Sequence, residues 1–453
     1  MVKNNYTLVD GKRENTFIIG IIFTLIISTL IYSYYNKIST YIICISFLCF
    51  LRRIRMSKIT SLYSPWLFCA ITFILYGLTA PIFNIFYSFL PDFVIHNGLL
   101  LYAFAGIGLS FASFIGLRSD RVIKWRLNLL PKELFVLGLV LLGFGLILMG
   151  YMISKHTSAL RGDYLERAVL RQGWASTGIN FVIVGLLVLF YALSSKKITF
   201  RLACFFLLVL GLSFTLLLIM GGRRHMLLLL TGIFIIFNFR IKKISQTIAI
   251  ILGISFFVFL LLWQQMRSAI GSKDVHSYIS PVKVETVRLV TNTEFYKNYR
   301  FIHMILSDPY FKDKRYGKTY LEVLYLLIPR VFWPDRPPPI GVQFARLTGL
   351  TGGAGRGFPA VAEGYINFGY TGILIHFFII GMFVNWLQKK ADKEGEEGGN
   401  HIDILIYALG LIYIPWVFRN TISAVTKGFL FLQIFPIWVS SVAIIIFKDS
   451  VKK

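Results

Sequence analysis

Long apolar runs alternate with short polar segments along most of the chain. The hydrocarbon core of a bilayer is about 30 Å thick, and a helix needs about 20 predominantly apolar residues to cross it. The runs, two of them short (39–51 and 225–239), predict about twelve transmembrane helices and an all-α polytopic membrane protein. The predicted helices lie at 16–34, 39–51, 65–86, 98–117, 133–154, 178–193, 202–220, 225–239, 247–263, 370–387, 402–418 and 429–447.

Lysines and arginines cluster at alternate ends of the predicted helices, which is how the positive-inside rule encodes orientation. With the N-terminus in the cytoplasm, basic clusters fall on the cytoplasmic side at 52–58, 121–126, 196–201, 240–243, 389–393 and 448–453. The opposite loop 87–97 contains no Lys or Arg. The charge pattern therefore predicts that both termini face the cytoplasm.

One outer segment, 264–369, is much longer than the others and separates an N-terminal transmembrane bundle, 1–263, from the C-terminal transmembrane helices, 370–453. Apolar residues at helical spacing predict an amphipathic helix within 282–306. The short, strongly apolar stretch 320–328 is typical of a helix in the membrane interface. We therefore expect a long, partly helical extracytoplasmic loop before the last three helices.

Composition narrows the possible functions. The net charge of +26 is explained by topology rather than by nucleic acid binding, because the basic residues flank the helices. The four cysteines lie in apolar runs and predict neither a disulfide framework nor a metal site. The sequence has no HExxH motif, Walker A loop or G-x-S-x-G elbow, so we expect no metal, nucleotide or other cofactor.

Several arginines are retained on the outer side against the charge bias. The motif GGRRHM places Arg223 and Arg224 after two glycines at the outer end of an apolar run. Their planar guanidinium groups suit phosphate, and the alternative is that they extend to lipid headgroups. The same two interpretations stay open for Arg161, Arg167 and Arg419.

The motif IPRVFWPDRPPP, at 328–339, is stiffened by consecutive prolines. It would hold Arg330, Asp335 and Arg336 in fixed positions beside Trp333. Arginines bind diphosphate, carboxylates accept protons from hydroxyl groups, and aromatic rings stack on sugar faces. The alternative is a rigid re-entry turn with an interfacial tryptophan.

The motif EGYINFGYTG, at 363–372, places Glu363 at the mouth of a predicted transmembrane helix. Acids at membrane depth are functional-site hypotheses by default, because ionised groups are costly there. The alternative is a solvated carboxylate at the end of the helix.

Taken together, the glycine–arginine turn at 221–224, the PR-x-x-WPDRP segment at 329–337 and the EGY-x-NFG-x-x-G return at 363–372 resemble blocks of a known family. This family is the bacterial oligosaccharide repeat unit polymerases, the Wzy-type O-antigen and capsule polymerases. The resemblance covers the whole chain in topology, but in sequence it is confined to these blocks. The W-P-D-R-P block is the most specific of them.

The resemblance implies a glycosyltransferase of the bacterial inner membrane, with its active site facing the periplasm or cell exterior. Such enzymes use undecaprenyl-diphosphate-linked oligosaccharides within the lipid bilayer. They move the growing glycan from its carrier to the non-reducing end of the next unit. The leaving group is already activated, so no cofactor is needed. The resemblance also implies a chain-length regulator as a protein partner.

The resemblance also implies roles for individual residues. Arginines stabilise the departing diphosphate, and the candidates for this role are Arg223, Arg224, Arg330, Arg336 and Arg419. The acceptor hydroxyl needs positioning and a base, for which the candidates are Asp335, Glu363 and His303. Trp333 and Tyr365 are candidates for stacking on sugar rings.

Two other functions stay open. An O-antigen ligase has a similar topology and the same donor, but it transfers finished chains to lipid A core. A flippase or exporter of lipid-linked sugars usually places charge at the membrane midplane and often has repeated halves. The WPDRP block and the charge gathered outside the membrane favour the polymerase.

Overall fold

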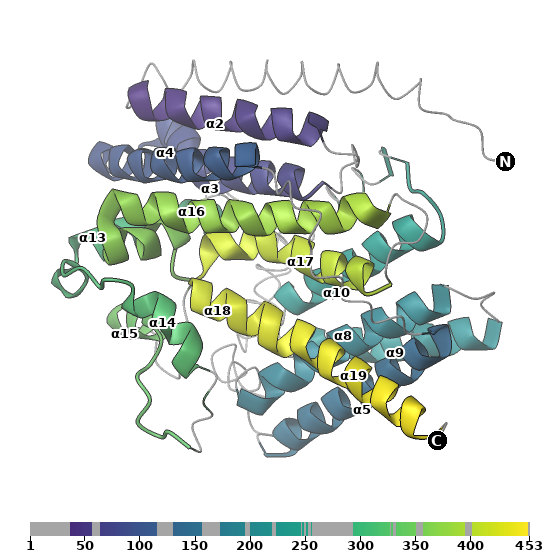
Figure 1. The fold of residues 1–453 in the computed structure, drawn as a ribbon. Helices are drawn as coiled ribbons and strands as arrows, with labels where there is room; N and C mark the ends of the chain where they lie inside the picture. The colour runs from purple at the N-terminus through teal and green to yellow at the C-terminus, as the bar shows by residue number, and fades with distance from the viewer. Residues whose placement is uncertain are drawn as a thin grey trace, which may run out of the picture.

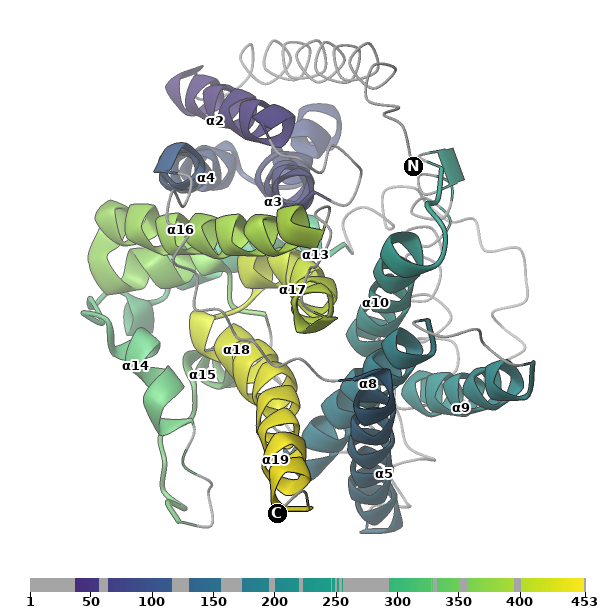
Figure 2. The ribbon, with the colours of Figure 1, turned by 45° about the vertical axis from the view of Figure 1, so that its right-hand side comes forward.

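The described part of the chain consists of helices without any strand, as the apolar pattern predicted. The computed structural model describes residues 37–56, 64–115, 130–155, 173–194, 200–219, 223–245, 247–248, 251, 255, 293–326, 328, 332–349, 357–394 and 401–451. The helices form two groups that lie side by side (Figures 1 and 2).

The first group contains α2 (Lys37–Met56), α3 (Pro65–Tyr87), α4 (Asp92–Ile115), α16 (Ala360–Glu394) and α17 (His401–Arg419). Helix α4 packs along α2 and α16, and α17 packs on α3 and α16. The second group contains α5 (Pro131–Lys155), α8 (Gly173–Ser194), α9 (Phe200–Ile219) and α10 (Arg223–Arg240). Its most extensive packing contact is between α5 and α8, where glycines such as Gly138, Gly145 and Gly185 allow the two backbones to approach closely.

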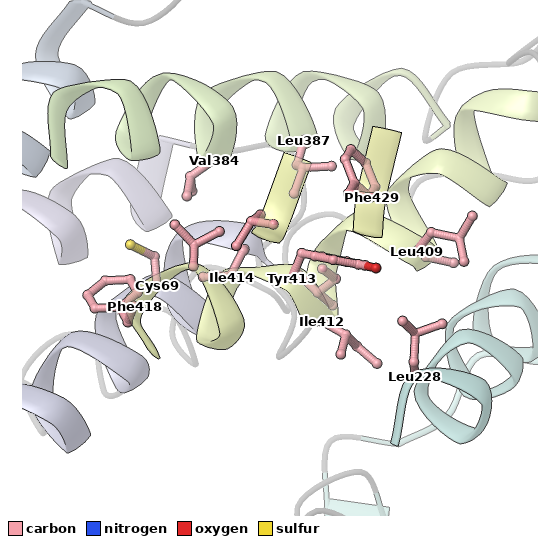
Figure 3. Packing of buried hydrophobic residues seen from close by; sticks show 14 of the residues in the cluster. Cys69, Leu228, Val384, Leu387, Leu409, Ile412, Tyr413, Ile414, Phe418 and Phe429 are labelled. Atoms are coloured by element: carbon pink, nitrogen blue, oxygen red, sulfur yellow. The ribbon is translucent and has the colours of Figure 1, made fainter. Parts of the chain in front are cut away.

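Helix α17 lies where the two groups meet. Its side chains are buried on nearly all sides, as expected for a helix that is apolar all round. Figure 3 shows residues of α17 packed among side chains from α3, α10, α16 and the π-helical segment η4 (Lys427–Ile434). The labelled neighbours of α17 are Cys69, Leu228, Val384, Leu387 and Phe429. The chain then continues into α19 (Phe435–Val451), which contacts α5.

Seven candidate membrane spans are present among the described residues. They are Pro65–Tyr87, Asp92–Ile115, Pro131–Lys155, Thr177–Ser194, Ala360–Asp392, Ile402–Arg419 and Ile422–Ile444. Cys204–Leu217 and His225–Arg240 are shorter apolar helices. The predicted helix 16–34 and most of 247–263 lie outside the described residues. Twelve spans with both termini in the cytoplasm therefore stay a prediction.

Three short helices follow one another at the same end of the first group: α13 (Glu294–Ser307), α14 (Lys318–Tyr325) and α15 (Ile340–Leu347) (Figure 1). Helix α13 is the second half of the predicted amphipathic segment 282–306, and 282–292 lie outside the described residues. Helix α14 starts two residues earlier and ends three residues earlier than the predicted stretch 320–328. Gly317 is its N-cap residue, and the chain turns after Tyr325.

Buried aromatic residues fasten α13 to the transmembrane helices. The Tyr299 ring stacks on that of Tyr102 at 5.9 Å, and its hydroxyl donates to the carbonyl oxygen of Gly77. The Asn298 amide donates to the Tyr102 hydroxyl at 2.6 Å. Helix α13 is thus anchored directly to α3 and α4.

Buried polar contacts fix the far end of α16. Asn385 accepts a hydrogen bond from the Trp66 indole at 3.0 Å, and its amide donates to the carbonyl oxygen of Ala112 at 2.6 Å. Lys390 forms a buried ion pair with Asp403 of α17. Helix α16 is therefore held at one end by these contacts and at the other by those described next.

Candidate functional site

The EGYINFGYTG motif forms a sharp reversal within α16. Gly369 has φ +65°, ψ −145°, a combination that favours glycine, and Phe368 before it is also non-helical. A Cβ on Gly364 would lie 2.8 Å from the Cα of Ile373. In a continuous helix, residues nine apart are separated by about 13.5 Å. Helix α16 is therefore a hairpin whose arms, 360–367 and 370–394, pack backbone against backbone.

Glu363 lies on the first arm of this hairpin and is completely buried. Its Oε1 accepts a hydrogen bond from the Thr319 hydroxyl of α14 at 2.9 Å. Its Oε2 accepts from the backbone N–H of Ile422 at 2.8 Å, the first residue of α18 (Ile422–Thr426). Glu363 is thus not a solvated end charge: it joins α14, the hairpin and α18.

Glu322, on α14, is a second buried carboxyl that the sequence analysis missed. Its side chain is 3% exposed. Its Oε1 accepts from the N–H of Ile340 at 2.9 Å, and its Oε2 accepts from the Ser423 hydroxyl at 3.1 Å. Burial raises the pKa of the Glu322 carboxyl to about 7, although these hydrogen bonds and the charge of Arg315 act in the opposite direction. The one feature of the sequence that could have identified Glu322 is its position as an acid inside the apolar stretch 320–328.

Side chains from other elements accept hydrogen bonds at the N-terminal ends of all three short helices α14, α15 and α18. The first N–H of α15 and that of α18 each donate to a carboxyl group, and the N–H of the residue before α14 donates to an amide oxygen. Gly317, the residue before α14, donates its N–H to Asn367 Oδ1 at 2.9 Å. Glu322 accepts from the first N–H of α15, and Glu363 accepts from the first N–H of α18. The Asn367 amide also donates to the Thr319 hydroxyl at 2.6 Å. The first N–H groups of a helix lack partners within it, and the N-terminus favours negative charge. These long-range contacts therefore hold the helices around the hairpin.

Arg336, from the proline-rich motif, stabilises the opposite end of α14. Its Nη1 donates to the carbonyl oxygens of Tyr325 at 3.2 Å, Leu326 at 3.2 Å and Ile328 at 2.7 Å. The last carbonyl groups of a helix are unpaired and carry partial negative charge, which a cation stabilises. Arg336 is therefore already engaged with protein oxygens on one of its nitrogens.

Trp333 and Asp335 lie on an exposed turn before Arg336. The N–H of Arg336 donates to the carbonyl oxygen of Trp333 at 3.3 Å. The Trp333 ring meets that of Tyr325 edge-on, with 6.3 Å between ring centroids. The Asp335 carboxylate is exposed to solvent. The turn thus presents an aromatic ring and an acid together at the surface.

Further cations approach this region from the C-terminal helices. Arg419 forms an ion pair with Glu294 of α13 at 3.1 Å, and the two side chains are 40% and 35% exposed, so solvent screens this pair. A Cβ on Gly357 would lie 2.8 Å from Arg419 Cγ, which places Arg419 against the start of the hairpin. Lys427, on η4, is within electrostatic reach of Arg336.

Tyr365 and His303 have different surroundings. The Lys314 ammonium lies 4.0 Å from the centroid of the Tyr365 ring and donates to the Tyr365 carbonyl oxygen at 3.2 Å. The Tyr365 ring also meets that of Tyr370, which stacks on Phe104 of α4. The His303 ring contacts Phe93, and its Nδ1 is 3.1 Å from the Ser307 hydroxyl. These contacts place His303 on the α4 side of α13.

The structure therefore attaches two of the predicted residues, Arg336 and Glu363, to the same short helix, α14. Trp333 and Asp335 lie on the turn before Arg336, and Arg419 lies against the start of the hairpin. Arg161, Arg167 and Arg330 lie outside the described residues, and Arg223 and Arg224 begin α10 with side chains that are also outside them. Guanidinium and ammonium groups from several segments suit an anionic substrate, since they form charge-assisted hydrogen bonds with phosphate oxygens. An exposed acid and indole ring beside them suit a ligand with hydroxyl groups.

The fold and site thus define a multi-pass helical membrane protein with a cationic region at one end. Residues 346–453 match the model of a protein family described as O-antigen polysaccharide polymerase Wzy. The matched region contains the hairpin with Glu363, helix α17 and the α18 corner with Ile422 and Ser423. For this C-terminal part of the chain, which includes the EGYINFGYTG motif, the match confirms the resemblance to the Wzy-type polymerases; the blocks 221–224 and 329–337 lie outside the matched residues. No curated protein and no solved structure matches the chain.

Proposed function

We propose that the protein polymerises oligosaccharide repeat units carried on undecaprenyl diphosphate at the outer face of the bacterial inner membrane. The observation that carries this proposal is the family match, which falls on the hairpin and the α18 corner. Through Glu363 and Ser423, these elements are bonded to α14, where the WPDR turn also attaches. In this proposal the WPDR turn and the EGYINFGYTG motif, two of the three blocks that suggested this family, contribute to a single site.

In the proposed reaction, a hydroxyl oxygen at the non-reducing end of the incoming unit attacks the anomeric carbon of the growing glycan. The bond from that carbon to the diphosphate oxygen breaks, and undecaprenyl diphosphate leaves with the electron pair. The hydroxyl proton passes to a base. We assign to Arg336, Arg419 and Lys427, whose surroundings are described above, the stabilisation of the charge that develops on the diphosphate.

Asp335 is the better candidate for the base among the two predicted acids. Its carboxylate is exposed beside Trp333, whereas both oxygens of Glu363 are occupied by protein hydrogen bonds. A general base must come within hydrogen-bond reach of the proton that it removes. We therefore assign Asp335 to proton transfer and Glu363 to positioning. Arg161, Arg167, Arg223, Arg224 and Arg330 stay proposed contacts to the lipid-linked substrate.

Deletion of the gene, followed by electrophoresis of the surface glycans, tests this function. A polymerase predicts loss of the long ladder, with single repeat units left on lipid A core or, for a capsule, on the carrier. Loss of all capping, with polymer accumulating on undecaprenyl diphosphate, would identify a ligase. An unchanged glycan pool on the outer face would also contradict the proposal.

Complementation of the deletion strain tests the assignment of the base. We expect Asp335→Asn to reduce polymer by on the order of 100-fold or more, since general bases contribute about 10²–10⁴-fold. Asp313→Asn is the matched control, because Asp313 is another exposed carboxylate in the outer segment. Equal polymer from both variants would exclude Asp335 as the base.

A further inference from the structure

The segment 332–339 is attached to α14, the helix that precedes it, at two points. In its middle, directly after the turn with Trp333 and Asp335, Arg336 bonds to the carbonyl oxygens at the C-terminal end of α14. At its end, Pro339 leads into α15, whose first N–H, that of Ile340, donates to Glu322 on α14. Glu322 thus closes a loop between residues 18 positions apart in the sequence. Consecutive prolines stiffen the path between the two tethers.

Glu322 also fixes this loop relative to the C-terminal helices. Its second carboxyl oxygen accepts from the Ser423 hydroxyl on α18, which follows the corner that carries Arg419. On the same face of α14, Thr319 bonds to Glu363 of the hairpin. The exposed WPDR turn is therefore attached through one carboxyl to the same corner that supplies cations to the site.

We propose that Glu322 is a positioning residue that holds the turn bearing Trp333 and Asp335 in register with Arg419 and the α16 hairpin. The proposal rests on the transfer reaction proposed above, to which it adds a residue with no substrate contact. Misplacement of a reacting group by about 1 Å can cost on the order of 100-fold in rate. Loss of the Glu322 tether is therefore expected to slow transfer more than it weakens substrate binding.

The test compares Glu322→Ala, Glu322→Gln and the control Asp313→Asn in the full-length protein. The substrate is the lipid-linked repeat unit extracted from a strain that lacks the gene, and the readouts are the maximal transfer rate and the KM. We expect Ala to reduce the rate at saturating substrate on the order of 10- to 100-fold with a smaller change in KM. Gln keeps an acceptor for the Ile340 N–H and should restore most of the rate.

Hydrogen exchange provides a readout that does not depend on the transfer reaction. In Glu322→Ala, the amide of Ile340 loses its acceptor, so the first turn of α15 should exchange faster while α17 remains protected. If the wild-type protein makes no polymer but this change occurs, the proposed function fails and the tether stands. Wild-type rates in a folded Ala variant would overturn the positioning role. A Gln variant as inactive as Ala would also overturn it, because Glu322 would then act through its charge.

A second pair of variants covers the case in which Glu322→Ala does not fold. Ile340→Pro removes the N–H that Glu322 accepts, and proline is tolerated at the first position of a helix. Ile340→Ala loses a similar part of the buried side chain but keeps the N–H. A transfer rate lower for Pro than for Ala supports the tether, and equal rates contradict it.

Discussion

Replacement of Glu322 by Gln should change how the stability of the protein depends on pH. Burial raises the pKa of Glu322 from 4.5 in the unfolded chain to about 7 in the folded protein. Between these values the folded protein holds a proton that the unfolded chain releases. Stability contributed by this group is therefore present at low pH and is lost as the pH rises through about 7.

The size of the effect follows from the shift of the pKa. One pKa unit corresponds to about 1.36 kcal/mol, so a shift of about 2.5 units gives a loss of about 3 kcal/mol between pH 4.5 and 8. Gln has the shape of the protonated acid and does not titrate. The charged and titratable groups that face Glu322 are Arg315, Tyr325 and Glu363, and all three are unchanged in the variant.

The assay is thermal unfolding of the purified protein in detergent from pH 5 to pH 8.5, with wild type, Glu322→Gln and Asp313→Asn compared. The stability of the Gln variant should approach that of wild type at pH 5 and exceed it by about 3 kcal/mol at pH 8. The control should show no such divergence. A difference between Gln and wild type that is independent of pH would refute the raised pKa and the reasoning from burial.

Three further substitutions test the contacts around the site. Gly364→Ala would place its Cβ 2.8 Å from the Cα of Ile373, so we expect the stability measured by thermal unfolding to fall by about 1–3 kcal/mol and polymer to be lost in complementation. Wild-type behaviour would contradict the close packing of the hairpin arms. Asn385→Ala leaves the buried Trp66 indole without its acceptor and should cost about 1–3 kcal/mol by the same unfolding assay, and no loss would contradict that contact. Arg336→Ala removes the cation from the end of α14 and should accelerate hydrogen exchange in its last turn, whereas unchanged exchange would show that the carbonyl contacts do not stabilise it.

The apolar periodicity was sufficient to predict the helical class and the positions of most described helices, because each depends on local sequence. The reversal in the EGYINFGYTG motif, where Phe368 and Gly369 are non-helical, was not predicted. That Gly364 would face Ile373 was not predictable, because the contact exists only once the chain has folded back. The sequence indicated a return to the membrane but not a hairpin.

The partners of the acids were beyond sequence reasoning for a related reason. Glu363 was recognised as a candidate because it precedes a predicted transmembrane helix. Its hydrogen bond to the N–H of Ile422 was not predictable, because the two residues are 59 positions apart in the sequence. Glu322 was passed over because one acid in an apolar stretch matches an interfacial helix. Its bond to Ser423 spans 101 positions, which no local pattern encodes.

The most direct test of the polymerase proposal is reconstitution of the purified protein with its lipid-linked repeat unit in liposomes. No nucleotide or other protein is added, and the products are separated by length. We expect a ladder of glycans on undecaprenyl diphosphate, with one free undecaprenyl diphosphate released for each unit added. Single units that persist unchanged beside folded protein, or that only move across the bilayer, would contradict the proposed polymerase.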